Sequence, residues 1–274
     1  MNKSATGYGK VLITGGTSGL GFAIVNQFLD EGYDVVATGR NLIKTPSCNT
    51  RFTFLKTDFG DLKQTSRTLK EVCKDCRFDI VINNAGVLGK PEFLFTDDGF
   101  EYTFQVNFLA HLLINEIILN DIVPDRPMKI AAIISPVYRI ADKELAIRYR
   151  SKEYKPFKAY SGSKLLLALM CSYLPLKYPT YNLRCICYDP GVFRSEIFRM
   201  QKEWFRVLYR IAAPVMRDPA IIAREFYHII RKEDLVNGMV YKSNKTTLFQ
   251  SGIDKCVVDS FWMECNEIIE QYLE

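Results

Sequence analysis

The 274-residue sequence predicts an α/β fold of the doubly wound class, in which a parallel sheet carries helices on both faces. Short apolar runs rich in β-branched residues alternate with longer amphipathic segments along most of the chain, which is the pattern of repeated βα units. Hydrophobic residues make up 48% of the chain and charged residues 24%, an ordinary globular composition for one large domain. No internal repeat or interdomain linker interrupts the pattern, so we expect residues 1–274 to form a single domain.

The stretch "KVLITGGTSGLGFAIVNQFLDEGYDVVATGR" contains the first such unit. Its strand runs from Val11 to Thr14, a glycine-rich turn follows, and Leu20, Ile24 and Phe28 then recur at helical spacing. Gly32 ends the helix and a second strand, "DVVATG", begins. A strand–turn–helix–strand unit of about thirty residues is the context of a Rossmann-type nucleotide-binding fold.

The alternation continues toward the C-terminus. We expect strands at "FTFLKTD", "DIVIN", "KIAAIIS" and "NLRCICYD", and helices over 61–74, 100–120 and 158–177. Residues 136–157 and 192–218 break the pattern, and both stretches follow the carboxyl ends of strands. In open α/β sheets the ligand crevice lies at those ends.

Two short patterns carry candidate chemistry. In "TGGTSGLG", residues 14–21, glycines at the strand-to-helix turn let backbone N–H groups approach a pyrophosphate, although a purely structural turn is the simpler alternative. In "KAYSGSKLLLALM", Tyr160 and Lys164 lie four residues apart and share one helical face. A solvated surface pair is the ordinary reading of such spacing.

These patterns occur together with "NNAG" at 83–86, and the combination resembles the short-chain dehydrogenase/reductase family over about residues 8 to 245. Asn107, Ser135 and the "DPGVFRSEI" element also match, with Ser195 standing where the family has threonine. Tyr160 lies 25 residues after Ser135. This long gap is most similar to the retinol dehydrogenase branch and its WW-domain oxidoreductase and protochlorophyllide reductase relatives. Pro136 and Gly162 depart from the usual pattern.

The resemblance implies a catalytic group of Asn107, Ser135, Tyr160 and Lys164. Tyr160 would exchange a proton with the substrate oxygen, and the Lys164 ammonium would lower the phenol's pKa from about 10. The family pattern further implies that Lys164 holds the nicotinamide ribose, that Ser135 contacts the substrate oxygen and that Asn107 holds a water.

The implied cofactor is NADP, with NAD possible. No carboxylate follows the second strand, where Gly39 leaves room and the Arg40 guanidinium can bind a 2′-phosphate. Asn83 is expected to maintain sheet geometry. The expected cofactor-binding residues are Gly15, Thr17, Ser18, Gly19, Leu20, Gly21, Arg40, Asp58, Asn84, Ala85, Gly86, Tyr160, Lys164, Pro190, Gly191, Val192 and Ser195.

We therefore expect an NADP(H)-dependent oxidoreductase that interconverts a carbonyl and an alcohol on a largely apolar small molecule. Reduction of a carbon–carbon double bond and a catalytically silent NADP-binding regulator are the alternatives. Near 192–218 we expect an inserted substrate lid, because Ile197, Met200, Trp204, Leu208 and Ile211 recur at helical spacing. A fixed surface helix or a helix on an anionic membrane surface would have the same pattern.

Other expectations concern partners and location. The net charge of +5 does not by itself point to nucleic acid, and a homo-oligomer is possible. The eight cysteines read as free thiols with no metal site, although Cys73 and Cys76 form a CxxC. His111 and His228 are expected to serve helix packing. With no signal-peptide core and no apolar run of 18 residues, we expect a soluble cytoplasmic protein.

Overall fold

The structure is a computed structural model that describes residues 9–42, 44–46, 50–120, 127–147, 154–193 and 216–274. Its centre is an eight-stranded sheet in the order β3-β2-β1-β4-β5-β6-β7-β8. Neighbouring strands from β3 to β7 are parallel, and β8 pairs antiparallel with β7 at the edge. The strands are β1 (Lys10–Ile13), β2 (Asp34–Gly39), β3 (Phe52–Lys56), β4 (Ile80–Asn83), β5 (Met128–Ile133), β6 (Leu183–Tyr188), β7 (Met239–Lys242) and β8 (Lys245–Leu248).

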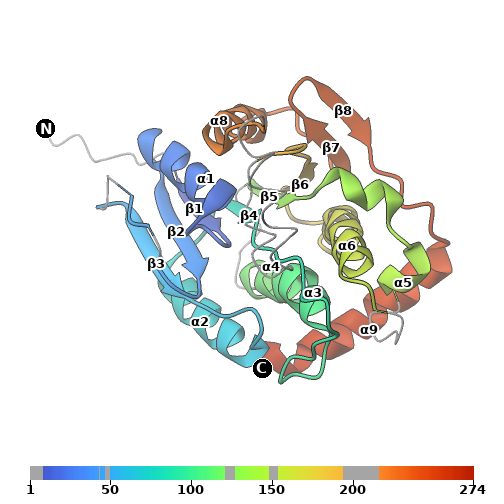
Figure 1. The fold of residues 1–274 in the computed structure, drawn as a ribbon. Coiled ribbons are helices and arrows are strands. Elements are labelled where there is room, and N and C mark those ends of the chain that lie inside the picture. The colour runs from blue at the N-terminus through green and yellow to red at the C-terminus, as the bar shows by residue number, and fades with distance from the viewer. Residues whose placement is uncertain (1–8, 43, 47–49, 121–126, 148–153, 194–215) are drawn as a thin grey trace, which may run out of the picture.

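Helices cover both faces of this sheet, which confirms the expected doubly wound fold (Figure 1). Helices α1 (Gly19–Asp30) and α8 (Pro219–Ile230) pack against each other on one face. Helices α2 (Leu62–Asp75), α4 (Ala110–Asn120) and α6 (Pro156–Lys177) lie on the other face. Each face has its own buried apolar cluster, and strand residues contribute alternately to the two clusters.

The expected helix over 100–120 is not one continuous α-helix. It consists of α3 (Tyr102–Phe104), a π-helical turn η1 (Gln105–Leu109) and then α4. The π turn places Asn107 so that its side chain bonds the backbone of Val87, and π turns of this kind often accompany functional sites.

The irregular stretch 136–157 contains two short elements among its described residues. A 3₁₀ turn, η2 (Pro136–Ile140), begins directly at Pro136, and α5 (Lys143–Ile147) follows. A Cβ atom at Gly162 would lie 3.2 Å from Cα of Ala146, so the glycine lets α5 approach α6 closely. Most of the expected lid, including Trp204, falls in 194–215 and lies outside the described residues.

The final helix, α9 (Lys255–Leu273), lies outside the α2–α4–α6 layer and closes the larger apolar cluster (Figure 1). Its Trp262 ring stacks on Tyr173 of α6 at a centroid distance of 4.1 Å. Phe261 of the same helix stacks on Phe108 at 5.8 Å. Sequence reasoning assigned no element to this region, so α9 is a finding of the structure.

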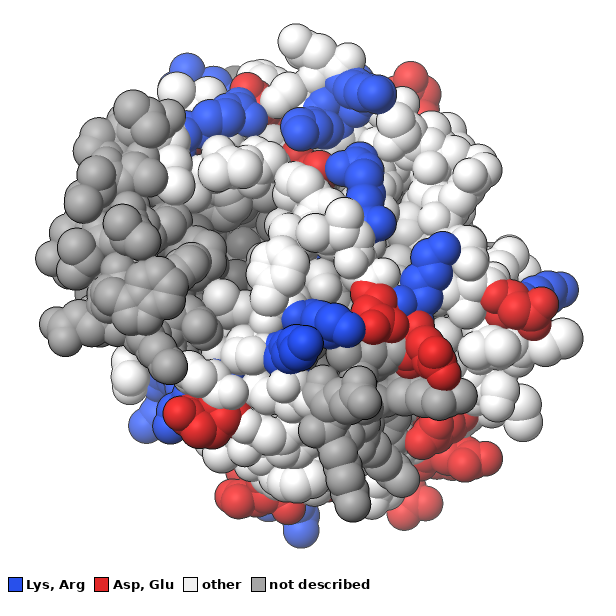
Figure 2. All heavy atoms as spheres, turned by 45° about the vertical axis from the view of Figure 1, so that its right-hand side comes forward, with Lys and Arg blue, Asp and Glu red and all other residues white. Residues whose placement is uncertain are grey.

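Charged side chains of both signs occupy the face of the molecule in Figure 2. Acidic side chains gather at its lower right, and basic side chains lie across its upper and middle parts. No single sign covers this face. Among the described residues, no helix has the length and apolar character needed to cross a bilayer.

We predict that Trp262→Ala lowers the free energy of unfolding by about 3–5 kcal/mol, because it empties a buried aromatic position. Trp262 is 4% exposed, whereas its neighbour Met263 is 65% exposed. Met263→Ala is therefore the matched control and should change stability by less than about 0.5 kcal/mol. Urea unfolding of both variants measures the difference, and equal effects would show that α9 does not close the core.

Candidate active site

A cavity of about 490 Å³ opens at the carboxyl ends of the strands, where the ligand crevice of such a sheet is expected. It extends from the glycine turn after β1, past the ends of β2, β3 and β4, to the turns after β5 and β6. The predicted site residues that line it are Gly15, Thr17, Ser18, Gly19, Leu20, Gly21, Arg40, Asp58, Asn84, Ala85, Gly86, Ser135, Tyr160, Lys164, Pro190, Gly191 and Val192. Asn107 does not line it, and Ser195 lies outside the described residues.

The glycine turn is too closely packed to accept side chains at several positions. A Cβ atom at Gly21 would lie 2.2 Å from the Gly15 carbonyl oxygen, and one at Gly15 would lie 2.9 Å from Cα of Ala85. Gly19 differs, because its Cβ would meet no protein atom within 4 Å, and its φ is +53°. The turn thus presents open backbone at the N-terminus of α1, where the helix dipole favours an anion.

The structure fits a nicotinamide dinucleotide at two further points. Thr38 lines the cavity, and its buried hydroxyl has no hydrogen-bond partner among the residues that the structure describes. The buried Lys164 ammonium donates to the Ile133 carbonyl at 2.9 Å, which leaves donors for ribose hydroxyls. Both residues line the cavity with hydrogen-bonding capacity left over, which fits a polar ligand there.

Tyr160, Ser135 and Lys164 come together at the cavity as the sequence predicts. The Lys164 Nζ atom lies 5.8 Å from the centroid of the Tyr160 ring. Burial raises the pKa of Tyr160 to about 12, and its hydrogen bond with Ser135 lowers it in part. In the protein alone the pKa of this phenol is therefore raised rather than lowered as expected, and the dominant cause is desolvation by burial.

Burial also lowers the pKa of Lys164 to about 8. Desolvation disfavours the charged form, and the described residues in its first contacts supply a carbonyl rather than a carboxylate. The ammonium is thus still the main form at pH 7, at a cost to folding.

Asn107 lies beside the cavity rather than in its lining, and its expected role in holding a water stays a prediction. Its side-chain amide donates to the Val87 carbonyl and to the Ser163 hydroxyl, each at 2.9 Å, and its oxygen accepts from the Val87 N–H at 2.7 Å. Ser163 in turn donates to the Tyr160 carbonyl at 2.8 Å. Asn107 therefore connects the segment after β4 to the helix that carries Tyr160.

Asp58 and Asn83 serve local structure in addition to their expected roles. One Asp58 carboxylate oxygen accepts from the Gly60 N–H at 3.0 Å, while the residue also lines the cavity. The Asn83 and Asn115 side-chain amides bond each other and so link the end of β4 to α4, while the expected role of Asn83 in sheet geometry stays a prediction.

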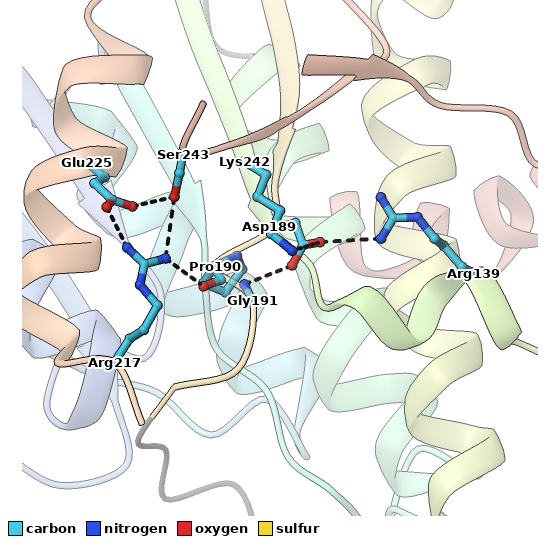
Figure 3. A network of polar contacts seen from close by, with 8 residues as sticks. All are labelled: Arg139, Asp189, Pro190, Gly191, Arg217, Glu225, Lys242 and Ser243. Atoms are coloured by element: carbon cyan, nitrogen blue, oxygen red, sulfur yellow. Dashed lines mark hydrogen bonds and ion pairs between the residues drawn. The ribbon is translucent and has the colours of Figure 1, made fainter. Parts of the chain in front are cut away.

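Sequence reasoning missed Asp189, which is fully buried beside the Pro190–Gly191 loop (Figure 3). Its carboxylate accepts from the Gly191 N–H at 2.9 Å. The half-exposed cations of Arg139, from η2, and Lys242, from β7, lie 3.5 and 3.9 Å from its other oxygen. Asp189 thus ties the turn after Ser135 to the loop after β6. The tight Asp-Pro-Gly sequence is a turn signal that could have identified it.

A second polar group in Figure 3 supports the same loop. Arg217 donates to the Pro190 carbonyl at 3.4 Å and forms an ion pair with Glu225. Ser243 donates to the other Glu225 oxygen at 2.8 Å. Arg217 therefore connects the Pro190 backbone to Glu225 of α8, and Ser243, from the turn between β7 and β8, bonds the same carboxylate.

The opposite end of the cavity is largely apolar. Its walls come from the segment after β4, the η2 turn, the start of α6 and the loop after β6. These lining residues are Leu88, Pro136, Val137, Phe157, Val192, Phe193 and Met216.

The remaining candidate groups are thiols and histidines. Each described cysteine is a free thiol, and the described residues include no cluster of three or more potential metal ligands. His111 is fully buried in α4. His228 is exposed on α8, so the expectation that it serves helix packing is wrong.

Comparison with known proteins gives a family match. A sequence profile described as short chain dehydrogenase matches residues 9–205. Human polyprenol dehydrogenase is 26% identical over 204 residues, which cover 69% of this chain and 62% of that protein. Mouse retinol dehydrogenase 13 is 28% identical over 200 residues, covering 69% and 60%. The chain thus spans less than two-thirds of the length of these curated relatives.

Solved structures share the fold at lower identity. A crystal structure of an uncharacterized protein from Mycobacterium paratuberculosis aligns with a TM-score of 0.70 and 20% identity, covering 97% of this chain and 95% of that chain. A 3-ketoacyl-(acyl-carrier-protein) reductase from Brucella melitensis, complexed with NADH, aligns with a TM-score of 0.63 and 17% identity, covering 86% and 96%.

We predict that Lys164→Met raises the free energy of unfolding at pH 7 by roughly 1–3 kcal/mol, because it removes a buried charge. The folded pKa of Lys164, about 8, lies below that of an unfolded lysine near 10.5. The unfolded chain therefore binds the extra proton between these values, and wild type regains stability as pH rises from 8 toward 10. The gain of the variant should shrink over that range.

Urea unfolding of wild type and variant at pH 7 and 9.5 measures this difference. Lys158→Met is the matched control, because it removes a partly exposed ammonium from the same helix and should give no gain at pH 7. A Lys164→Met variant that is less stable than wild type at pH 7 would contradict the prediction.

Proposed function

Because the chain belongs to the short chain dehydrogenase family, we propose that it is an NADP(H)-dependent oxidoreductase that interconverts a carbonyl and an alcohol on a largely apolar small molecule. One observation carries this proposal: Ser135, Tyr160 and Lys164 line one cavity with the glycine turn. The relatives, named as dehydrogenases of polyprenol and of retinol, support the reaction class.

In the proposed reaction, each of three residues of this chain has a separate role. When bound, the nicotinamide supplies or accepts the hydride. Tyr160 is positioned to give a proton to a carbonyl oxygen, or to take one from an alcohol. Ser135, its hydrogen-bond partner, would hold the same substrate oxygen. The Lys164 ammonium beside the ring favours the phenolate, and so assists a tyrosine whose burial opposes ionisation.

The preference for NADP rests on the end of β2. Arg40 is exposed and lines the cavity, and Gly39 precedes it without a side chain. A guanidinium offers paired donors to a phosphate, and no carboxylate at this strand end repels one. Thr17 also lines this part of the cavity and could share the phosphate.

The proposal of an apolar substrate rests on the walls of the cavity beyond Ser135. Phe157, Phe193 and Val137 line that end, and retinol and polyprenol, named for the relatives, are largely hydrocarbon alcohols. Burial of such a molecule against these side chains would supply its binding free energy. We further propose that residues 1–274 form one domain; the expected cytoplasmic location stays a prediction.

The direct test is a screen of purified protein with NADPH against ketones, aldehydes and enones, followed at the nicotinamide absorbance. Turnover of apolar ketones or aldehydes supports the proposal. Turnover of enones at the double bond alone would favour the carbon–carbon reductase, and binding of NADPH without any turnover would favour the silent regulator.

We predict that Tyr160→Phe lowers kcat by about 10²- to 10⁴-fold while the Kd for NADPH changes little, because only the proton-transferring hydroxyl is removed. Steady-state rates and cofactor fluorescence titration measure the two quantities. Tyr154→Phe is the control, since the Tyr154 hydroxyl donates to the Lys90 carbonyl at 3.0 Å outside the proposed proton transfer. Near-normal turnover of Tyr160→Phe would remove this residue from the mechanism.

We predict that Arg40→Ala raises the Kd for NADPH by about 10- to 100-fold and leaves that for NADH nearly unchanged, because a charge-assisted hydrogen bond contributes roughly 1.5–3 kcal/mol. Gly39→Asp is a less direct variant, since a Cβ there would lie 3.0 Å from the Thr17 side chain. The control is Arg51→Ala, which removes another exposed arginine. All titrations are made at one salt concentration. A wild-type protein that binds NADH more tightly than NADPH would refute the assignment of Arg40 to the 2′-phosphate.

A further inference from the structure

His111 lies between two parts of the cavity wall that are distant in sequence. It is fully buried, its Nδ1 atom is 2.9 Å from the Asn107 carbonyl oxygen, and its Nε2 atom is 2.9 Å from the Thr14 hydroxyl oxygen. The Phe59 ring meets the imidazole edge-on at 5.3 Å. Both ring nitrogens therefore have a polar partner.

The partners determine which nitrogen carries the proton. A carbonyl oxygen can only accept, so Nδ1 of His111 must donate to Asn107. The Thr14 hydroxyl oxygen already accepts from the N–H groups of Asn84 and Ala85, at 2.8 and 2.9 Å. Both lone pairs of this oxygen are thus used, so Nε2 of His111 can only accept from Thr14. The Thr14 hydrogen has two acceptors in reach, Nε2 of His111 at 2.9 Å and the Ile82 carbonyl at 3.3 Å, and the shorter contact favours Nε2. Every donor in this group has an acceptor only when the imidazole is neutral and protonated on Nδ1.

The surroundings keep the imidazole neutral. Burial, and after it the charge of Lys164, lower the pKa of His111 to about 3. The only charged group among these causes is the Lys164 ammonium, which repels a second cation. His111 therefore takes up no second proton at neutral pH and stays a neutral imidazole.

Each end of the His111 bridge leads to a part of the site. Through Thr14 it reaches the backbone of Asn84 and Ala85, which lines the cavity. Through Asn107 it reaches Val87 and Ser163, and Ser163 bonds the Tyr160 carbonyl. The imidazole thus joins the wall beneath the cofactor to the helix that carries the tyrosine.

We propose that His111 is a positioning residue, a neutral Nδ1-protonated imidazole that holds the Thr14 hydroxyl and the Asn107 carbonyl at a set separation. The spacing between the cofactor-binding wall and Tyr160 depends on this bridge. The effects on turnover and on NADPH affinity rest on the proposed function, whereas the tautomer does not. A loss of only one contact should therefore alter both NADPH binding and turnover.

The first test is the tautomer of His111 in the full-length wild-type protein. Two-bond ¹H–¹⁵N correlation spectra distinguish the two neutral forms, and the chain has only two histidines. The exposed His228 is assigned by His228→Phe. We expect Nδ1–H for His111 from pH 5 to 8, and an Nε2–H form or a protonated ring would overturn the proposal.

The second test uses variants that remove one or both contacts. His111→Phe keeps an aromatic ring and removes both hydrogen bonds, so the Kd for NADPH should rise and kcat fall, each by about 5- to 100-fold, because buried partners are left unsatisfied. His111→Gln retains a donor and an acceptor and should recover part of both losses. His228→Phe is the matched control and should match wild type in both quantities.

A double-mutant cycle with Thr14→Val tests the bridge itself. If His111 and Thr14 act through one bond, the losses in NADPH affinity combine to less than the product of the single losses. Fully independent losses, or a His111→Phe protein with wild-type Kd and kcat, would overturn the proposal. A variant with a lower melting temperature but unchanged Kd and kcat would show a stabilising role only, which also overturns it.

These outcomes separate the proposal from the proposed function. If wild type binds NADPH but reduces no carbonyl, the oxidoreductase function fails, but the tautomer and the NADPH cycle still decide the role of His111. If His111→Phe does not fold, the double-mutant cycle is measured with His111→Gln and Thr14→Val, which change the shape of the site less. The quantity compared is again the Kd for NADPH.

Discussion

The buried ammonium of Lys164 is the constraint on which the site depends. The fold places this charge under the carboxyl edge of the sheet, where its protein acceptor is the Ile133 carbonyl at the end of β5. A charge in such a place costs free energy unless other groups share it. Two neighbours accommodate the ammonium. Gly86 has no side chain, and a Cβ atom there would lie 3.3 Å from Nζ of Lys164, while Tyr160 lies one helical turn before the lysine. Lys164 also lines the cavity, where its remaining N–H groups would donate to ribose hydroxyls of a bound cofactor.

The groups around this charge are held mainly by buried hydrogen bonds to backbone. Thr14 and Asn107 each bond backbone from a distant part of the chain, and Ser163 accepts from the Asn107 side chain while donating to the backbone of its own helix. Such bonds have a narrow range of length and direction, so each one limits how far its two segments can move apart. A neutral imidazole suits this group better than a charged one, because a second cation beside Lys164 would add repulsion.

The walls of the cavity differ in how they are supported. The glycine turn is held by close packing, as the positions of Gly15 and Gly21 show. The Pro190–Gly191 loop is instead held by charged side chains, with Asp189 between Arg139 and Lys242 (Figure 3). Close packing defines a rigid binding surface for the dinucleotide. Half-exposed ion pairs are weaker and salt-dependent, so the loop at the proposed substrate end is the less firmly held wall.

The sequence by itself determined six of the eight strands, β1 to β6, and most of the cavity lining, but not β7 and β8. Strands and helices follow from hydrophobic periodicity, which is local, and β2 (Asp34–Gly39) begins and ends where "DVVATG" predicts. Glycine turns and the Tyr160–Lys164 spacing are equally local, so motif matching located them. The predicted lid, by contrast, lies mostly outside the described residues.

Only the tertiary structure decided how distant polar groups meet. His111 and Thr14 are 97 residues apart in sequence, and no local pattern shows that they bond each other. The same holds for Asp189 and Arg139, 50 residues apart, and for Trp262 stacked on Tyr173. The pKa of Tyr160 likewise depends on burial, which is a property of the packed molecule. The sequence correctly placed the lysine beside the tyrosine, but it did not reveal that desolvation raises the pKa of the phenol.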